Sequence, residues 1–197
     1  MSDSLSVRKG TSRHRDAALA AAELFQSLDQ PDTKLVVFYC AADFDLPALA
    51  TRLQRLFGET NVSGCTTAGE ITPQGYLAGA LTGFSLASPE LDVATEVIAL
   101  DPFDSVASGS VVTKQLKTLG TRAGLPPSAT DTFAFLLIDG LAMQEEPVVS
   151  CVHQHLQGIE MVGGSAADDA RFGATHIYYR GEFRQNIAIL TLVRSDL

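Results

Sequence analysis

Short apolar segments of strand length alternate with segments whose apolar positions recur at helical spacing. Helical spacing over residues 16–28 and 46–57 predicts two helices, and Pro47 and Gly58 suit the start and the end of the second. The continuous apolar run 35–39 between them predicts a buried strand. The first half further predicts strands at 61–63, 78–87 and 91–100, a turn at 88–90, and a helix from Pro102 to Leu119.

The second half has the same order of patterns. Residues 133–138 form another apolar run, and a helical stripe begins at Pro147. A short strand at 161–162 and a hairpin from His176 to Val193, turning at residues 180–182, complete the series. The mixture of parallel βα units and hairpins predicts an α+β fold, with mixed β-sheet layers flanked by helices in an αββα-like arrangement.

The order of elements indicates an internal repeat. A shift of 100 residues brings Pro47 onto Pro147, and a shift of 99 brings Gly64 onto Gly163. The predicted halves, each a βαββ unit, are residues 33–120 and 132–195. A true duplication and two unrelated βαβ units both agree with this pattern. Residues 1–13 are polar and are expected to be a disordered arm before one domain over residues 14–197.

Composition and charge argue against several classes of function and partner. The chain has 197 residues and a formal net charge of −9. Nucleic acids and anionic membranes bind basic patches, so neither is expected as a partner. No apolar stretch has the length of a membrane span, and no apolar segment follows the N-terminus as in a signal peptide. Three cysteines without a CxxC pair suit a reducing, cytoplasmic compartment and argue against a cysteine-rich metal site.

Two glycine-rich stretches at equivalent places in the halves are the candidate ligand site. Each follows a predicted strand and ends in carboxylates, and ligands collect at the carboxyl ends of strands in βα units. Small residues let a backbone approach a ligand closely. The candidate ligand-binding residues are Gly64, Cys65, Thr66, Thr67, Gly69 and Glu70 in the first stretch, and Gly163, Gly164, Ser165, Asp168 and Asp169 in the second.

The chemistry of these stretches suggests an amine-bearing ligand. Glu70, Asp168 and Asp169 would anchor an amine or a cation, and the backbone amides of residues 64–66 would hold a carboxylate. A tight bend between packed backbones, or turn-forming acids on the surface, would explain the same residues without a ligand. The strand ends at Cys40–Asp43 and Asp139–Gly140 are further candidates for the rim of this site.

Other residues carry weaker signals. Cys65 would need a nearby base and a lowered pKa to act as a nucleophile, so we expect no enzyme, with a hydrolase or transferase as the alternative. His153, His155 and His176 are candidates for an axial haem ligand, and haem b is the cofactor they would hold. Covalent c-type haem is excluded because no CxxCH is present.

One stretch resembles a known family. Residues 64–71 read Gly-Cys-Thr-Thr-Ala-Gly-Glu-Ile and are followed by Gly75-Tyr76; with Val36–Tyr39 and Phe44–Leu46 they resemble the FIST N-terminal domain. Residues 162–169 look like the second glycine motif of that domain. The resemblance covers about residues 33–195.

The resemblance implies a cytosolic sensory module of bacterial signalling that binds a small ligand, such as an amino acid, and relays it to a partner protein. Some FIST proteins are haem-based nitric-oxide sensors that regulate a histidine kinase or cyclic-di-GMP signalling, which is the alternative. FIST proteins usually continue into a C-terminal FIST domain, a further implied partner that this sequence lacks. A truncated chain and a short family member both agree with this.

Overall fold

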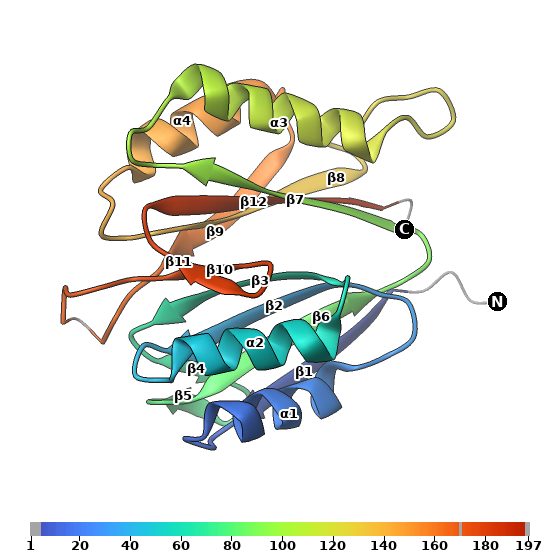
Figure 1. Cartoon of the computed structure of the whole chain (residues 1–197). Coiled ribbons are helices and arrows are strands. Elements are labelled where there is room, and N and C mark those ends of the chain that lie inside the picture. Colours follow the sequence, from blue (N-terminus) through green and yellow to red (C-terminus); the bar gives the residue numbers. More distant parts are fainter. Residues whose placement is uncertain (1–4, 170, 196–197) are drawn as a thin grey trace.

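Two β-sheets stacked face to face form the centre of the protein, and a pair of helices covers the outer face of each (Figure 1). The computed structural model describes residues 5–169 and 171–195. The helices are α1 (Ala17–Leu28), α2 (Leu46–Phe57), α3 (Ser105–Leu119) and α4 (Glu145–Leu156). The strands are β1 (Ser6–Ser12), β2 (Thr33–Ala41), β3 (Asn61–Thr67), β4 (Glu70–Thr72), β5 (Gly75–Leu77), β6 (Leu81–Ala87), β7 (Leu91–Ala99), β8 (Thr132–Ile138), β9 (Glu160–Ser165), β10 (Ile177–Tyr179), β11 (Glu182–Arg184) and β12 (Ile187–Ser195).

Local signals in the sequence explain where three of the helices begin. The side chains of Asp16, Asp45 and Asp104 each accept a hydrogen bond from a backbone N–H in the first turn of α1, α2 and α3. Pro47 in the first turn and Gly58 after the last turn of α2 also match their predicted places. Helix α4 begins without a side-chain cap.

Apolar residues form three layers of core that hold these elements together. Leu24, Leu49 and Leu53 of α1 and α2 pack on one sheet, and Val112, Val148 and Val152 of α3 and α4 pack on the other. Between the sheets, β2, β3, β8, β10 and β12 contribute buried apolar side chains. The layering is therefore αββα, and the predicted α+β class is confirmed.

The two sheets share one topology. The first sheet has the order β1-β6-β2-β3-β10-β11 and the second β7-β12-β8-β9. In both sheets, the first strand of the half (β1 or β7) pairs antiparallel with its closing strand (β6 or β12). The closing strand pairs antiparallel with the second strand (β2 or β8), which in turn pairs parallel with the third (β3 or β9). Each half is thus built as β-α-β-α-β followed by a closing strand, with β4–β5 inserted in one half and β10–β11 in the other.

Three predictions about this organisation are wrong. Residues 6–12 form strand β1 instead of a disordered arm, because their backbone pairs with β6; residues 1–4 lie outside the described residues. The predicted halves 33–120 and 132–195 misplace α3, which packs on the second sheet beside β7. The predicted hairpin partner of β10 is also wrong, since β10 pairs with β11 and with β3, while β12 lies in the second sheet.

Candidate functional site

Most of the two glycine stretches lies in strands. Residues 64–67 belong to β3 and residues 163–165 belong to β9, so the prediction that the strands end at residues 63 and 162, before the two stretches, is wrong. The glycines allow close packing there: a Cβ on Gly64 would lie 2.4 Å from the Phe38 ring, and one on Gly163 would lie 1.9 Å from the carbonyl oxygen of Leu136.

The two stretches meet at the carboxyl ends of their strands. The backbone N–H of Ala167 donates to the carbonyl oxygen of Thr66 at 2.9 Å. His176, which precedes β10, exchanges hydrogen bonds with the same threonine: its N–H donates to Thr66 Oγ1 at 3.0 Å and its carbonyl accepts from Thr66 N at 3.0 Å. The predicted proximity of the two stretches is therefore correct. The Thr66 amide, however, is used within the sheet and is not open to a ligand carboxylate.

Glu70 is buried and both of its carboxylate oxygens have partners. The side chain is 1 % exposed; Oε1 accepts from Thr67 Oγ1 at 2.7 Å and Oε2 accepts from the N–H of Ala80 at 2.9 Å. Burial raises the pKa of Glu70 despite these hydrogen bonds, and the nearby charge of Asp169 acts in the same direction. These contacts hold the β4–β5 hairpin against the end of β3.

Asp168 and Asp169 differ in their surroundings. The buried carboxylate of Asp168 accepts the N–H groups of Ala174, Gly173 and Phe172 at 2.9, 2.6 and 3.0 Å. The hydrogen bond from Ala174 is the largest cause of its lowered pKa. Asp169 has a positive φ of 56° and an ion pair with Arg171 at 3.3 Å. These contacts tie residues 171–174 to the two aspartates.

The other predicted residues are placed as follows. Cys65 is buried between the sheets, where burial raises its pKa to about 12. Gly69 has a φ of 134° and packs against the ring of Tyr76. Gly164 and Ser165 are exposed on β9, and Ser165 Oγ donates to Glu145 at 3.0 Å. Asp139, at the end of β8, accepts the hydroxyl of Thr175 and the N–H of Asn186.

A cavity of about 550 Å³ lies beside the junction of the two stretches. One wall is the segment after β2 with the first turns of α2, and the other wall is His176 with the β10–β11 hairpin. None of the predicted glycine-stretch residues lines it. Its lining residues are Ala42, Phe44, Asp45, Leu46, Pro47, Ala50, Thr51, His176, Gly181, Glu182 and Phe183.

The polar groups of this cavity are mainly acceptors. Asp45 uses Oδ1 to cap α2, accepting from Ala48 N at 3.0 Å. Glu182 Oε2 accepts from Arg184 at 2.6 Å. Burial lowers the pKa of His176, against the charge of Asp139, and its buried Nδ1 has no hydrogen-bond partner within the described residues. Of the described residues that line the cavity, none is a lysine or arginine.

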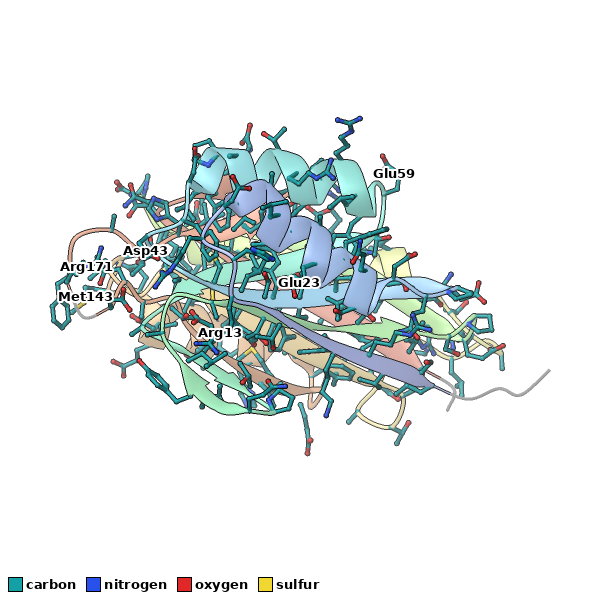
Figure 2. All side chains as sticks on the ribbon, turned by 90° about the horizontal axis from the view of Figure 1, so that it is seen from below. Arg13, Glu23, Asp43, Glu59, Met143 and Arg171 are labelled. Carbon is teal, nitrogen blue, oxygen red and sulfur yellow. The ribbon has the colours of Figure 1, made fainter. Side chains whose placement is uncertain are left out.

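Sequence reasoning missed most of this cavity. Phe44 and Asp45 belong to a segment that supports the family resemblance, but Thr51 and Phe183 carried no signal. They are brought together only because β10–β11 pairs with β3, far away in the sequence. Figure 2 shows Asp43 toward the same end of the molecule as Met143 and Arg171, where loops from both halves gather.

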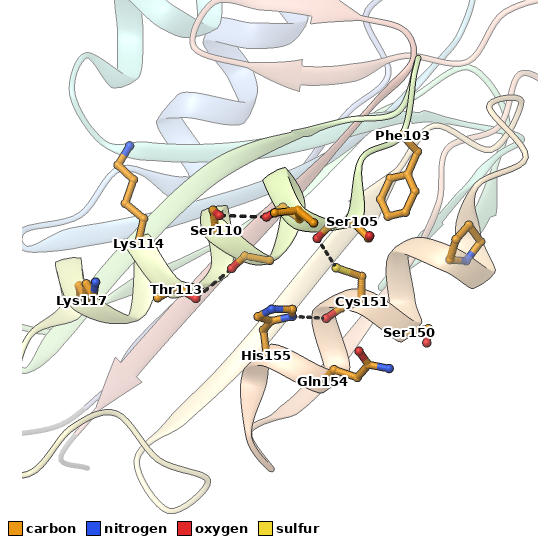
Figure 3. Close-up of a pocket in the computed structure, with 13 residues that line it drawn as sticks. Phe103, Ser105, Ser110, Thr113, Lys114, Lys117, Ser150, Cys151, Gln154 and His155 are labelled. Atoms are coloured by element: carbon orange, nitrogen blue, oxygen red, sulfur yellow. Dashed lines mark hydrogen bonds between the residues drawn. The ribbon is translucent and has the colours of Figure 1, made fainter.

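A second cavity, of about 850 Å³, is a groove between α3 and α4 (Figure 3). His155 lines it with its Nδ1 2.8 Å from the carbonyl oxygen of Cys151. The ring packs against the backbone of α3 at Gly109, because a Cβ added to this glycine would lie only 2.3 Å from His155 Nε2. His153, two residues earlier, is exposed on α4.

Comparison with family models gives one match, to the FIST N domain, over residues 34–197. This range includes the cavity and both glycine stretches. No curated protein matches the chain. Within the described residues, none of the helices is both long and apolar enough to cross a membrane.

Proposed function

Because the chain belongs to the FIST N domain family, a family of signal-transduction sensory domains, we propose that it binds a small amine-bearing ligand, such as an amino acid, and relays binding to a partner protein. The observation that carries the proposal is the cavity beside the junction of the halves: one wall comes from the first half and the other from the second. A ligand there contacts both halves at once.

The lining favours an amine over an anion. Asp45 Oδ2 supplies negative charge for an ammonium group, and Glu182 Oε1 offers a second acceptor beside the ion pair that Oε2 makes with Arg184. The Thr51 hydroxyl adds a further hydrogen-bonding group. Phe44, Leu46 and Phe183 would cover the apolar part of the same ligand. Glu70 and Asp168 are not part of this proposal because backbone and hydroxyl donors occupy their carboxylates.

Relay requires that the ligand bind two conformations unequally. The β10–β11 hairpin is the element placed to respond, since His176 lines the cavity and also holds Thr66 at the junction. Movement of this hairpin toward α2 would change the contact between the two sheets, and a partner such as a histidine kinase would read that change. The function is binding without catalysis: the Cys65 thiol, with its raised pKa, is a poor nucleophile at neutral pH.

Calorimetric titration with a panel of amines and amino acids tests this proposal. Asp45→Asn keeps the cap of α2 but removes the charge, and we expect it to weaken binding at least tenfold. Asp16→Asn, the same substitution at the cap of α1, is the matched control and should bind as the unchanged protein does. Equal binding by the Asp45 variant, or no binding of any amine, would refute the proposal.

The second candidate is a haem-based nitric-oxide sensor. It is favoured by Nδ1 of His176, which accepts or donates no hydrogen bond among the described residues, in a cavity lined by two phenylalanines. The imidazole would hold the iron, and bound haem would supply the gas-binding centre. The absence of lysine and arginine from the described lining leaves the propionates without cationic partners, so the amine ranks first. Haemin titration decides: a saturable Soret band lost in His176→Ala but kept in His153→Ala would support haem.

A further inference from the structure

Strand β9 differs from the other sheet edges in its chemistry. The two sheets have four edge strands, β1, β11, β7 and β9. Charged residues lie within three of them: Arg8 and Lys9 in β1, Glu182 and Arg184 in β11, and Asp92 and Glu96 in β7. Such charges discourage pairing with another chain. In β9 the only charge is Glu160, at the first residue, and Met-Val-Gly-Gly-Ser follows.

The other half of the molecule shows what such an edge accepts. Strand β3 holds the topological place of β9, and its outer side is covered by the antiparallel strand β10. The corresponding side of β9 has no strand within the described residues. We propose that two copies of this chain pair antiparallel through β9, forming a twofold-symmetric dimer in which the second sheet continues across both copies.

Backbone directions fix which residues can pair. Ala166 N donates to Ile138 O on β8, so the N–H groups of Gly164 and Val162 also face β8, and those of Met161, Gly163 and Ser165 face outward. In an antiparallel ladder, outward-facing residues pair with outward-facing residues. Pairing Met161 with Gly163 of the partner subunit meets this condition and puts Val162 beside Val162 of the partner subunit on the twofold axis.

This register is self-complementary in size and charge. Apart from Val162 on the axis, the large residues lie opposite glycines: Met161 opposite Gly163, and Glu160 opposite Gly164, of the partner subunit. A Cβ on Gly164 would have no atom within 4 Å, so there is room on its face. The two Glu160 carboxylates lie at opposite ends of the ladder, which avoids like charges directly across the strands.

Apolar side chains flank the edge on both faces of the sheet. Val162 is 60 % exposed. Phe133 of β8, which is 40 % exposed, lies on the same face, because it pairs with Glu160 and residues 160 and 162 of β9 share a face. On the helix face, α4 lies over β9, where Glu145 accepts from Ser165, and Val149 of α4 is 42 % exposed. A second copy would cover all three. A closed twofold interface consumes both edges, so pairing stops at the dimer.

Sedimentation velocity of the full chain over a concentration series tests the proposal. We expect a species of twice 20.9 kDa that dissociates on dilution. Val162→Glu places two carboxylates side by side on the axis and should raise the dissociation constant at least tenfold. Val106→Glu, at an exposed valine on α3, is the matched control and should leave it unchanged. A monomer at every concentration, or a dimer indifferent to Val162→Glu, would overturn the proposal.

Cross-linking tests the register separately. Facing residues of a non-hydrogen-bonded antiparallel pair have Cα atoms about 4.5 Å apart, within the range of a disulfide. Val162→Cys should therefore give a covalent dimer when a mild oxidant is added, and reductant should reverse it. Gly164→Cys, which faces Glu160 of the partner subunit in this register, should not cross-link. The native cysteines are buried and give no background. Equal cross-linking of both variants would refute this register.

Discussion

At the scale of single residues, buried charges have structural partners that the sequence does not display. Arg194, 1 % exposed, donates to Asp131 at 2.7 Å and to the carbonyl oxygens of Gly120 and Leu125 at 2.8 and 3.0 Å. Burial alone would raise the pKa of Asp131, but hydrogen bonds from Thr132 and Ser128 and the Arg194 guanidinium lower it to about 2. This ion pair attaches the end of β12 to the segment before β8.

Asp131→Asn should destabilise the protein by about 3 kcal/mol, because it leaves the buried guanidinium without its counter-charge. In the unchanged protein the stabilisation by Asp131 is complete above its unfolded pKa near 3.9 and is lost as pH falls toward about 2. Urea unfolding between pH 2 and 6 measures both effects. Asp92→Asn, at a half-exposed carboxylate paired with Arg122, should cost no more than about 1 kcal/mol. Equal costs for the two variants would contradict this.

Glu70 should show the opposite dependence on pH. Its folded pKa is raised, so its contribution is complete below the unfolded pKa near 4.3 and is lost as pH rises through the folded value. We expect Glu70→Gln to gain stability relative to the unchanged protein between pH 5 and 8, measured by urea unfolding. The exposed Glu59→Gln should show no such trend. A constant difference across this range would disprove the burial argument.

At the scale of elements, adjacent glycines of β9 have unequal roles. A Cβ at residue 163 would collide with a backbone carbonyl of β8, whereas a Cβ at residue 164 would meet nothing within 4 Å. Close approach of β8 and β9 therefore depends on one glycine of the pair.

Gly163→Ala should lower stability by about 2 kcal/mol or more, since β9 must move away from β8 to admit the methyl group. Gly164→Ala, the matched control, should change it by less than about 0.5 kcal/mol. Thermal unfolding of both variants at low protein concentration, where dimerisation does not contribute, makes the comparison. Similar losses in both would show that the strand spacing does not depend on residue 163.

The helices could be predicted because their signals are local: a capping aspartate, an apolar stripe and a glycine stop lie within one segment, as in α2. Strand β1 could not be predicted, because residues Ser6–Ser12 are mostly polar and exposed and show no apolar periodicity. The meeting of the two glycine stretches followed from their places at strand ends. The partners of Glu70 and Asp168 could not be predicted, since they depend on loop conformations that the residue pattern does not specify.

At the scale of the whole molecule, the halves are interlocked. The β10–β11 hairpin belongs to the second half by sequence but completes the first sheet. Apolar side chains and the Ser63–Thr191 hydroxyl contact at 2.9 Å join the sheets across the core. Each half alone would expose one face of its sheet, and the first would also lose the cover of β3.

We therefore expect residues 1–89 and residues 90–197, produced separately, to lack a cooperative unfolding transition, because each exposes the inter-sheet core. Mixing the two should restore it, as followed by circular dichroism with thermal unfolding. A sharp transition in the 1–89 fragment alone would show that the first sheet does not need the hairpin.

The β10–β11 hairpin, which completes the first sheet, also determines when that sheet can form during synthesis. Translation delivers β3 first, and its outer partner emerges much later, since Thr66 and His176 are 110 residues apart. Until then the nascent chain presents an open strand edge to the crowded surroundings of the ribosome, where open edges recruit other chains. The central strand of the second sheet, β12, is synthesised after the other strands of both sheets. The fold is therefore completed only once β12 has been synthesised, and nascent-chain chaperones have their opportunity to act before that point.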